Sequence, residues 1–193
     1  MNSSPQLHLA STSPRRREIL RSLGVEFEIT KVETDESPRQ GESPEELVLR
    51  LAIGKAEAAA GVELVLGADT VVVLDGRILG KPGDADDAVD MLLALSGRSH
   101  SVLTGVALRT AEGTRTVLSA TEVRFREIGR DEAIRYWQSG EPADKAGGYG
   151  IQGLGGMFVE AINGSYSGVM GLPVFETVEL LKSAGIEVLV NWK

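Results

Sequence analysis

Short apolar segments rich in β-branched residues alternate along this sequence with longer segments whose apolar residues recur at helical spacing. Such alternation is typical of an α/β fold, in which helices cover the faces of a sheet. Asp75-Gly76 is a two-residue turn signal between two of the strand segments. Strands are predicted at 7–10, 25–32, 62–74, 77–79, 101–109, 116–125, 157–162 and 186–190, and helices at 14–23, 84–95, 131–138, 172–184 and from Pro44 onward.

Two of the predicted helices begin with recognisable caps. Ser13 precedes Pro14, a residue that suits the first helical position, and Ser43 is followed three residues later by Glu46, which is the spacing of a capping box. No low-complexity linker or internal repeat interrupts the 193 residues, and a chain of this length can bury a core without disulfides. We therefore expect residues 1–193 to form a single domain.

Composition limits the metals and the partners. The chain has no cysteine and only two histidines, so a metal would be held mainly by oxygen, which favours Mg²⁺ or Mn²⁺. A formal net charge of -8 repels polyanions and disfavours a general nucleic-acid binder. The sequence has no apolar stretch long enough to cross a bilayer, and its start lacks the features of a secretory signal. We expect a cytoplasmic protein with no membrane partner.

Three consecutive arginines occupy the first turn of the first predicted helix: Arg15, Arg16 and Arg17. A helix start carries partial positive charge and unpaired N–H groups, so cations are unfavourable there unless an anion neutralises them. A phosphate held by the backbone N–H groups, by the hydroxyl of Ser11 or Ser13 and by arginine would do so. The alternative is an exposed basic face paired with Glu18.

One carboxylate interrupts the most apolar of the predicted strands. Asp69 lies within Val65-Leu-Gly-Ala-Asp-Thr-Val-Val-Val73. Burying a carboxylate costs on the order of several kcal/mol unless the group is paired, hydrogen-bonded or bound to a metal. Asp69 is therefore a candidate metal ligand or general base. The alternatives are a structural carboxylate that caps a neighbouring loop and an edge position that faces water.

A lysine continues the apolar face of the helix that begins at Pro44. Residues 47, 51 and 55 share one helical face, so Lys55 follows Leu47 and Leu51. Taken alone, this position favours a lysine that extends past its neighbours to solvent. The alternative is that its ammonium group meets an anion.

The segment 140–156 is rich in glycine and also holds Lys145, Tyr149 and Gln152. Glycine allows close approaches and backbone conformations that other residues do not, and the polar and aromatic residues indicate a recognition loop. Residues 148–153 match G-x-G-x-x-G formally. A dinucleotide-binding motif needs a helix after it, however, and here a strand is predicted to follow. No P-loop motif is present.

Taken together, an N-terminal Ser/Arg cluster, a lone strand aspartate, scattered lysines and a glycine-rich loop describe a phosphate site with an oxygen-bound metal. Several segments also resemble, in the same order and over nearly the whole chain, the Maf family of nucleoside triphosphate pyrophosphatases. These segments are Leu9-Ala-Ser-Thr-Ser-Pro-Arg-Arg16, Gly67-Ala-Asp-Thr-Val-Val72, Gly80-Lys-Pro82, Ser96-Gly97 with His100 and Thr104-Gly105, the loop 140–153, and Gly164-Ser-Tyr with Gly171-Leu-Pro173.

The resemblance implies an α/β fold with an elongated mixed sheet flanked by helices and two lobes around a central cleft. It also implies hydrolysis of a nucleoside triphosphate to the monophosphate and pyrophosphate, with Asp69 as proton acceptor. Arg15, Thr70 and Gln152 fall where the family sets base specificity. Lys145 and Gln152, within the D-K-A-G-x-Y-G-I-Q-G form, resemble the branch that prefers dTTP and UTP.

These residues suggest a mechanism in which water attacks the α-phosphorus and pyrophosphate leaves. Asp69 would orient or deprotonate the water, and Glu36 would help Asp69 to hold the metal. Phosphate charge would be stabilised by the metal and by Ser11, Ser13, Arg15, Arg16, Lys55, Lys81 and Lys145. Because a base benefits from a raised pKa and metal ligation lowers it, the two roles are open between Asp69 and Glu36.

Two rival functions use the same cleft. One is a non-catalytic nucleotide sensor that regulates cell division, since the family has been linked to septum formation. The other is a pyrophosphatase that removes purine nucleotides. The resemblance also suggests a homodimer.

Overall fold

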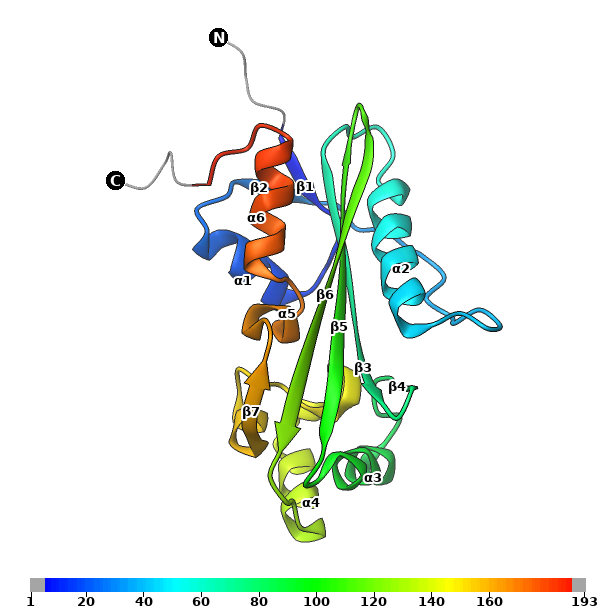
Figure 1. Cartoon of the computed structure of the whole chain (residues 1–193), viewed down its shortest axis with the longest axis vertical. Coiled ribbons are helices and arrows are strands. Elements are labelled where there is room, and N and C mark those ends of the chain that lie inside the picture. Colours follow the sequence, from blue (N-terminus) through cyan, green and yellow to red (C-terminus); the bar gives the residue numbers. More distant parts are fainter. Residues whose placement is uncertain (1–5, 189–193) are drawn as a thin grey trace.

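The computed structural model describes residues 6–188, which form an elongated molecule around one seven-stranded sheet (Figure 1). The strand order is β2-β1-β3-β5-β6-β7, with β4 paired to β3. Strand β1 is parallel to β2 and β3, and the other pairs are antiparallel. The strands are β1 (Leu7–Leu9), β2 (Phe27–Ile29), β3 (Val65–Leu74), β4 (Arg77–Leu79), β5 (Ser99–Thr110), β6 (Gly113–Phe125) and β7 (Val159–Asn163).

Helices cover both faces of this sheet, which confirms the predicted mixed α/β class. The α-helices are α1 (Pro14–Ser22), α2 (Pro44–Ala58), α3 (Ala85–Leu95), α4 (Arg130–Gln138), α5 (Tyr166–Met170) and α6 (Val174–Ser183). In Figure 1, α2 lies on one side of the upper half of the sheet and α1, α5 and α6 lie on the other, while α3 and α4 pack together at the lower end. Within residues 6–188, no helix combines the length and the apolar composition needed to cross a membrane.

Two glycines let α2 lie directly against the sheet. A Cβ atom added at Gly67 of β3 would collide with the backbone of Ala52, and one added at Gly105 of β5 would collide with the backbone of Val48. Asp69 is the register partner of Gly105. The absence of side chains at these two positions therefore brings the last turns of α2 close to Asp69.

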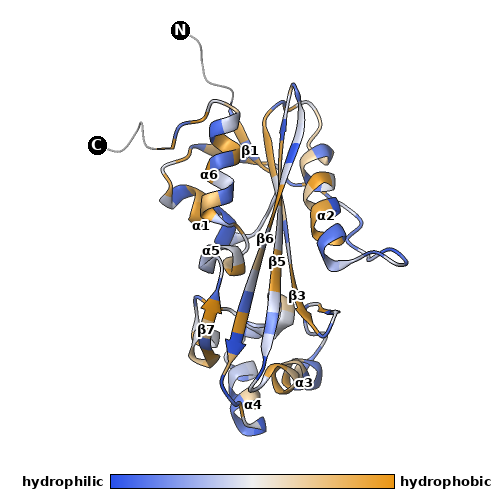
Figure 2. Cartoon of the chain, in the orientation of Figure 1, coloured by the Kyte–Doolittle hydropathy of each residue, from blue (hydrophilic) through white to orange (hydrophobic). Residues whose placement is uncertain are grey.

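Two apolar cores lie at opposite ends of the long strands β3, β5 and β6. The upper core joins β1, α1 and α6 to the sheet through residues that include Leu9, Leu20, Leu66, Leu108 and Leu181. The lower core joins α3, α4 and the glycine-rich segment through residues that include Val72, Leu92, Leu95, Phe125 and Phe158. In Figure 2, strands β1 and β3 are mainly hydrophobic, and the loop before α2 is mainly hydrophilic.

Most of the predicted elements are confirmed, with ends that differ by a few residues. The capping box forms as expected: Ser43 Oγ accepts from the Glu46 N–H, and Glu46 accepts from the Ser43 N–H. The strand predicted at 25–32 is shorter, because its partner β1 is itself only three residues long. The helix predicted at 172–184 begins one residue after Pro173, and the short helix α5 before it was not predicted.

The last strand, predicted at 186–190, is wrong for residues 186–188, which are not in a strand. Ile186 and Val188 instead pack against the upper core. These two apolar side chains are therefore buried against the upper core, and residues 186–188 do not pair with the sheet. Residues 189 and 190 lie outside the described part of the chain.

Candidate functional site

A cleft of about 600 Å³ opens along one edge of β3. Strand β1 pairs with β3 only as far as Leu66, and β4 pairs with it only from Val72. Among the described strands, neither covers residues 67–71 along that edge, so the cleft lies between the upper and lower parts of the molecule. All eleven site residues predicted from the sequence line it: Ser11, Ser13, Arg15, Arg16, Glu36, Lys55, Asp69, Thr70, Lys81, Lys145 and Gln152.

The N-terminus of α1 forms one wall of the cleft. Ser13 is the N-cap residue, but its side chain makes no capping hydrogen bond, and the first turn contains no acid. The Ser11 hydroxyl oxygen accepts from the Ser13 N–H and from Arg16 Nη1, both at 3.2 Å, so its own proton can point to a ligand. Together with Arg15, this uncapped helix start forms a surface that attracts anions.

Arg16 ties this wall to the rest of the fold. Its guanidinium donates to the Gly171 carbonyl oxygen at 2.7 Å and to Thr70 Oγ1 at 3.2 Å, and Thr70 Oγ1 lies 2.9 Å from Thr104 Oγ1. Burial lowers the pKa of Arg16, and the charge of Asp69 opposes this effect. The alternative of an exposed basic face therefore does not hold for Arg16, which joins α1 to β3 and to the end of α5.

Lys55 of α2 forms ion pairs with two carboxylates in the cleft. Its Nζ atom lies 2.6 Å from Asp69 Oδ1 and 2.6 Å from Glu36 Oε1. The side chains of Lys55 and Asp69 are each only 12% exposed. The expectation that Lys55 extends to solvent is therefore wrong, because α2 lies so close to β3 that the ammonium group reaches the buried aspartate.

The contact with Lys55 determines the charge state of Glu36. Burial by itself would raise the pKa of Glu36, but the hydrogen bond and the charge of Lys55 outweigh it and hold that pKa below its ordinary value. Glu36 is thus a carboxylate that keeps its charge beside Asp69.

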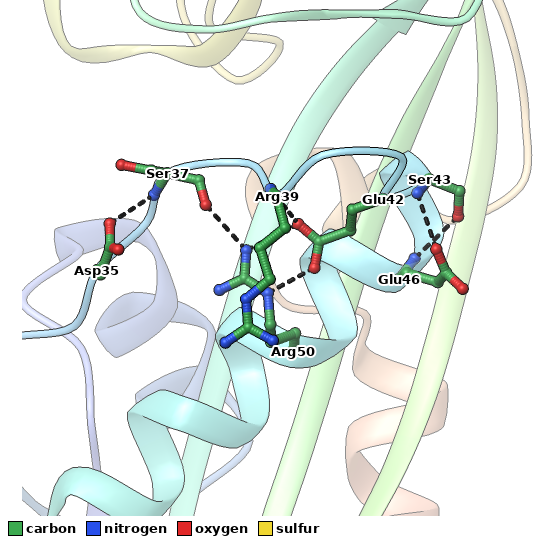
Figure 3. Close-up of polar contacts among 7 residues, drawn as sticks. All are labelled: Asp35, Ser37, Arg39, Glu42, Ser43, Glu46 and Arg50. Carbon is green, nitrogen blue, oxygen red and sulfur yellow. Dashed lines mark hydrogen bonds and ion pairs between the residues drawn. The ribbon is translucent and has the colours of Figure 1, made fainter.

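Glu36 belongs to the loop between β2 and α2, and Figure 3 shows polar contacts that fasten this loop to α2. Arg50 of α2 donates to both carboxylate oxygens of Glu42, from Nε at 2.5 Å and from Nη2 at 2.8 Å, and to the Ser37 carbonyl oxygen at 3.0 Å. The hydrogen bond from Arg50 lowers the pKa of Glu42 to about 2. Sequence reasoning missed this pair, because its spacing carries no signal until the path of the loop is known.

The end of β4 and the glycine-rich segment form the lower wall. Lys81 follows β4 and lines the cleft. The Gly147 N–H donates to the Gly80 carbonyl oxygen at 2.9 Å, which fastens the glycine-rich segment beside Lys81. Gly147 has a φ of 68°, and a Cβ atom there would press on Val72. Glycine is therefore required here for both its conformation and its size.

Lys145 and Gln152 project from the same segment. Lys145 Nζ donates to the Glu141 carbonyl oxygen at 2.9 Å and to Asp144 Oδ1 at 2.6 Å. Gln152 is exposed and lines the cleft. Three short 3-10 helices shape the segment: η1 (Glu141–Asp144), η2 (Ala146–Gly148) and η3 (Leu154–Phe158). The predicted recognition loop is thus an ordered structure against the cleft.

Tyr149 forms part of the cleft lining and is held from behind by a buried histidine. Its hydroxyl lies 2.8 Å from His100 Nε2, and both rings make edge contacts with Phe125. Burial lowers the pKa of His100 to about 4. The Nδ1 atom of His100 is buried without a hydrogen-bond partner among the described residues. Sequence reasoning did not connect these residues, which are far apart in the chain.

The residues best suited to hold a metal are Glu36 and Asp69. Their carboxylate oxygens converge on one cation, Lys55. Within residues 6–188 no three histidine, cysteine, aspartate or glutamate side chains gather as a metal-binding group. Two carboxylates suit Mg²⁺ or Mn²⁺ when water and phosphate oxygens complete the coordination.

Curated relatives match this chain over nearly its whole length. A protein named dTTP/UTP pyrophosphatase from Saccharophagus degradans is 51% identical in an alignment 197 residues long, gaps included. The alignment covers 98% of this chain and 94% of that protein. One with the same name from Hahella chejuensis is 56% identical over 189 residues, which cover 95% and 94% respectively.

Among solved structures, the Staphylococcus aureus Ham1 protein superposes with a TM-score of 0.45 and 17% identity, over 62% of this chain and 71% of that one. The family model described as Maf-like protein matches residues 6–184. This match spans both walls of the cleft, and it shows that the chain belongs to the Maf family.

Proposed function

We propose that this protein hydrolyses nucleoside triphosphates, with dTTP and UTP as preferred substrates, to the monophosphate and pyrophosphate. The observation that carries the proposal is the convergence of eleven chemically suited side chains on one cleft of about 600 Å³, a volume suited to a small-molecule ligand. The names of relatives that are 51% and 56% identical support the substrate class.

We assign the phosphates to the positively charged side of the cleft. The uncapped start of α1 offers backbone N–H groups and the hydroxyls of Ser11 and Ser13, with Arg15 beside them. Lys81 and Lys145 supply cations from the opposite wall. Such fixed donors stabilise charge that develops on the phosphates as the bond to the leaving group breaks.

Asp69 is the group that we assign to the attacking water. The oxygen of that water forms a bond to the α-phosphorus, the bond from the α-phosphorus to the bridging oxygen breaks, and pyrophosphate leaves. Asp69 takes the proton of the water and later releases it to solvent. Its Oδ1 atom accepts from Lys55, so we assign the water to Oδ2.

Mg²⁺ or Mn²⁺ fits the residues present. Glu36 and Asp69 are two carboxylates already drawn together by a cation, and an ion that arrives with the nucleotide needs few protein ligands. When bound, the ion would supply positive charge to the phosphates. Glu36 and Asp69 would hold the ion, and the ammonium group of Lys55 would then be available to the phosphates.

Base selection is assigned to the glycine-rich segment. The Gln152 amide can present both a donor and an acceptor to a pyrimidine edge. The hydroxyl of Thr70 already has protein partners: it accepts from Arg16 and lies 2.9 Å from the hydroxyl of Thr104. The Thr104 hydroxyl in turn donates to the Gly168 carbonyl oxygen. We therefore assign Thr70 to shaping the wall. A cytoplasmic location, a homodimer and the absence of nucleic-acid binding stay predictions.

A nucleotide panel tests the proposal directly. The protein is incubated with dTTP, UTP, CTP and GTP in the presence of Mg²⁺, and pyrophosphate release is measured. We expect release to be fastest from dTTP and UTP. Binding without release would favour the nucleotide sensor, and fastest release from GTP would favour the purine pyrophosphatase.

Asp69→Asn tests the assigned base. We expect kcat to fall by about 10²–10⁴-fold, the usual contribution of a positioned acid or base, because the amide cannot take the proton. Folding should be largely preserved, since Lys55 keeps its contact with Glu36. Asp75→Asn in the exposed β3–β4 turn is the matched control. A near-normal rate for the Asp69 variant would show that the assignment is wrong.

A further inference from the structure

The carboxylate of Glu141 lies at the centre of the glycine-rich segment. Its Oε1 atom accepts from the Tyr136 hydroxyl at 2.7 Å and from the Gly155 N–H at 2.9 Å, and its Oε2 atom accepts from the Leu154 N–H at 2.8 Å. The Tyr136 hydroxyl in turn accepts from the Gly150 N–H at 3.0 Å. Glu141 thus holds one end of the turn that carries Gln152 directly, at Leu154 and Gly155, and the other end, at Gly150, through the Tyr136 hydroxyl.

The glycines of this segment make room for that carboxylate and its partners. A Cβ atom at Gly153 would collide with the Glu141 carboxylate, and one at Gly155 would collide with the Tyr136 hydroxyl. Gly153 has a φ of -113°, and Gly155 is not among the residues with positive φ. Gly153 and Gly155 therefore need glycine for space. Within the formal G-x-G-x-x-G match, Gly150 and Gly153 leave room for Glu141 and its partners, whereas Gly148 has a φ of 68°.

The charge state of Glu141 agrees with its contacts. Burial by itself would raise the pKa of Glu141, but the hydrogen bonds from Gly155, Tyr136 and Leu154 outweigh it and hold that pKa below its ordinary value. An ionised carboxylate only accepts hydrogen bonds, and all three partners can donate. The main chain of Glu141 also takes part, because its carbonyl oxygen accepts from Lys145 Nζ.

We propose that Glu141 is a positioning residue that sets nucleotide affinity and base selectivity by holding the segment 145–156 in the shape that presents Gln152 and Lys145 to the cleft. Glu141 is not among the cleft-lining residues, so it acts through the segment and touches no substrate. This inference rests on the proposed function, because it names the part of the site that selects the nucleotide.

Glu141→Gln is the test, because the two side chains have the same shape. Whichever way the amide is turned, its NH₂ group faces the N–H of either Leu154 or Gly155, so one backbone donor loses its acceptor. We expect KM for UTP to rise about tenfold to a hundredfold, with kcat at saturating UTP changed less than about threefold. The preference for UTP over GTP should fall as well.

Glu132→Gln is the matched control. Glu132 pairs with Arg126 in the same part of the molecule, and neither residue lines the cleft. This variant should leave KM and selectivity unchanged even where it lowers the melting temperature. A Glu141 variant with unchanged KM and selectivity, or with a reduced kcat and unchanged KM, overturns the proposal.

Hydrogen exchange of the backbone amides separates this inference from the proposed function. In the Glu141 variant the amides of Leu154 and Gly155 should exchange faster than in the wild type, without nucleotide present. Unchanged exchange would overturn the positioning role. A wild-type protein that releases no pyrophosphate from any nucleotide would instead refute the proposed function, and the exchange comparison would still decide whether Glu141 orders the segment.

Discussion

At the scale of single residues, Lys55 sets the charge balance of the cleft. It follows Leu47 and Leu51 on the buried face of α2, where an ammonium group would be costly without partners. Asp69 and Glu36 provide those partners at 2.6 Å each. Each carboxylate in turn depends on this cation, because two nearby negative charges repel one another.

Lys55→Met should therefore change metal binding in the absence of nucleotide. Methionine keeps much of the apolar stem and removes the cation, so Mn²⁺ would no longer compete with it for Glu36 and Asp69. We expect Mn²⁺ to bind the variant at least roughly tenfold more tightly, a change that the loss of one adjacent charge can supply. The free ion is measured by electron paramagnetic resonance during a Mn²⁺ titration.

Lys182→Met on the surface of α6 is the control, because Lys182 pairs only with the neighbouring Glu179 in the described contacts. Equal Mn²⁺ affinity in the wild type and the Lys55 variant would argue against Glu36 and Asp69 as the metal ligands. Pyrophosphate release by the Lys55 variant should be slower than in the wild type.

At the scale of elements, the loop before α2 becomes part of the site through its attachment to that helix. Arg50 binds the Glu42 carboxylate and the Ser37 carbonyl oxygen (Figure 3). Glu36 lies one residue before Ser37, so this attachment limits where its carboxylate can go. The capping box of Ser43 fixes the other end of the same loop.

Arg50→Met should make the acid dependence of stability smaller. The pKa of Glu42 is lowered from 4.5 to about 2 in the folded protein. A carboxyl group with a lowered pKa stabilises the folded state above its ordinary pKa, and this contribution is lost as the pH falls toward the lowered value. The stability gap between wild type and variant should thus be largest at neutral pH and shrink between pH 4.5 and about 2.

Urea unfolding at a series of pH values measures this gap. Arg115→Met in the β5–β6 hairpin is the control, since its contact with Glu112 is long and exposed. A gap that stays constant over the whole range would contradict the role assigned to Glu42.

At the scale of the whole molecule, the cleft lies between two cores that share the strands β3, β5 and β6. The net charge of -8 belongs to the entire chain. A small ligand responds to the local field instead, and there Arg15, Lys81 and Lys145 line the same cleft as Glu36 and Asp69. A chain that repels polyanions can therefore still offer a site for a triphosphate.

His100 should make the lower core sensitive to mild acid. Burial lowers its pKa from 6.5 to about 4, so the unfolded chain binds the proton more readily than the folded one. The stability contribution is complete above pH 6.5 and is lost as the pH falls toward 4, by up to about 3 kcal/mol. Urea unfolding of His100→Gln should lack this loss, and an equal loss in the wild type and the variant would contradict the assignment.

Local sequence signals predicted most of the fold because they act over a few residues. The Ser43 capping box, the turn at Asp75-Gly76 and the β5–β6 hairpin needed no knowledge of distant contacts. The strand predicted at 186–190 is wrong for residues 186–188, because the apolar residues there pack against the upper core without forming a strand. The short helix α5 carried too few periodic positions to be recognised.

Ten of the eleven site candidates could be named from the sequence because each violates a local preference or falls in a segment that resembles the family. Glu36 could be named only as a second carboxylate that would help Asp69 to hold a metal. An aspartate in an apolar strand and arginines at a helix start are costly wherever the chain folds. Their convergence on one cleft depends on where β1 stops and β4 begins along β3. The contacts of Lys55, Arg50 and Glu141 depend on how closely α2, the preceding loop and the glycine-rich segment pack against their neighbours. The spacing of residues along the chain does not determine these packing distances.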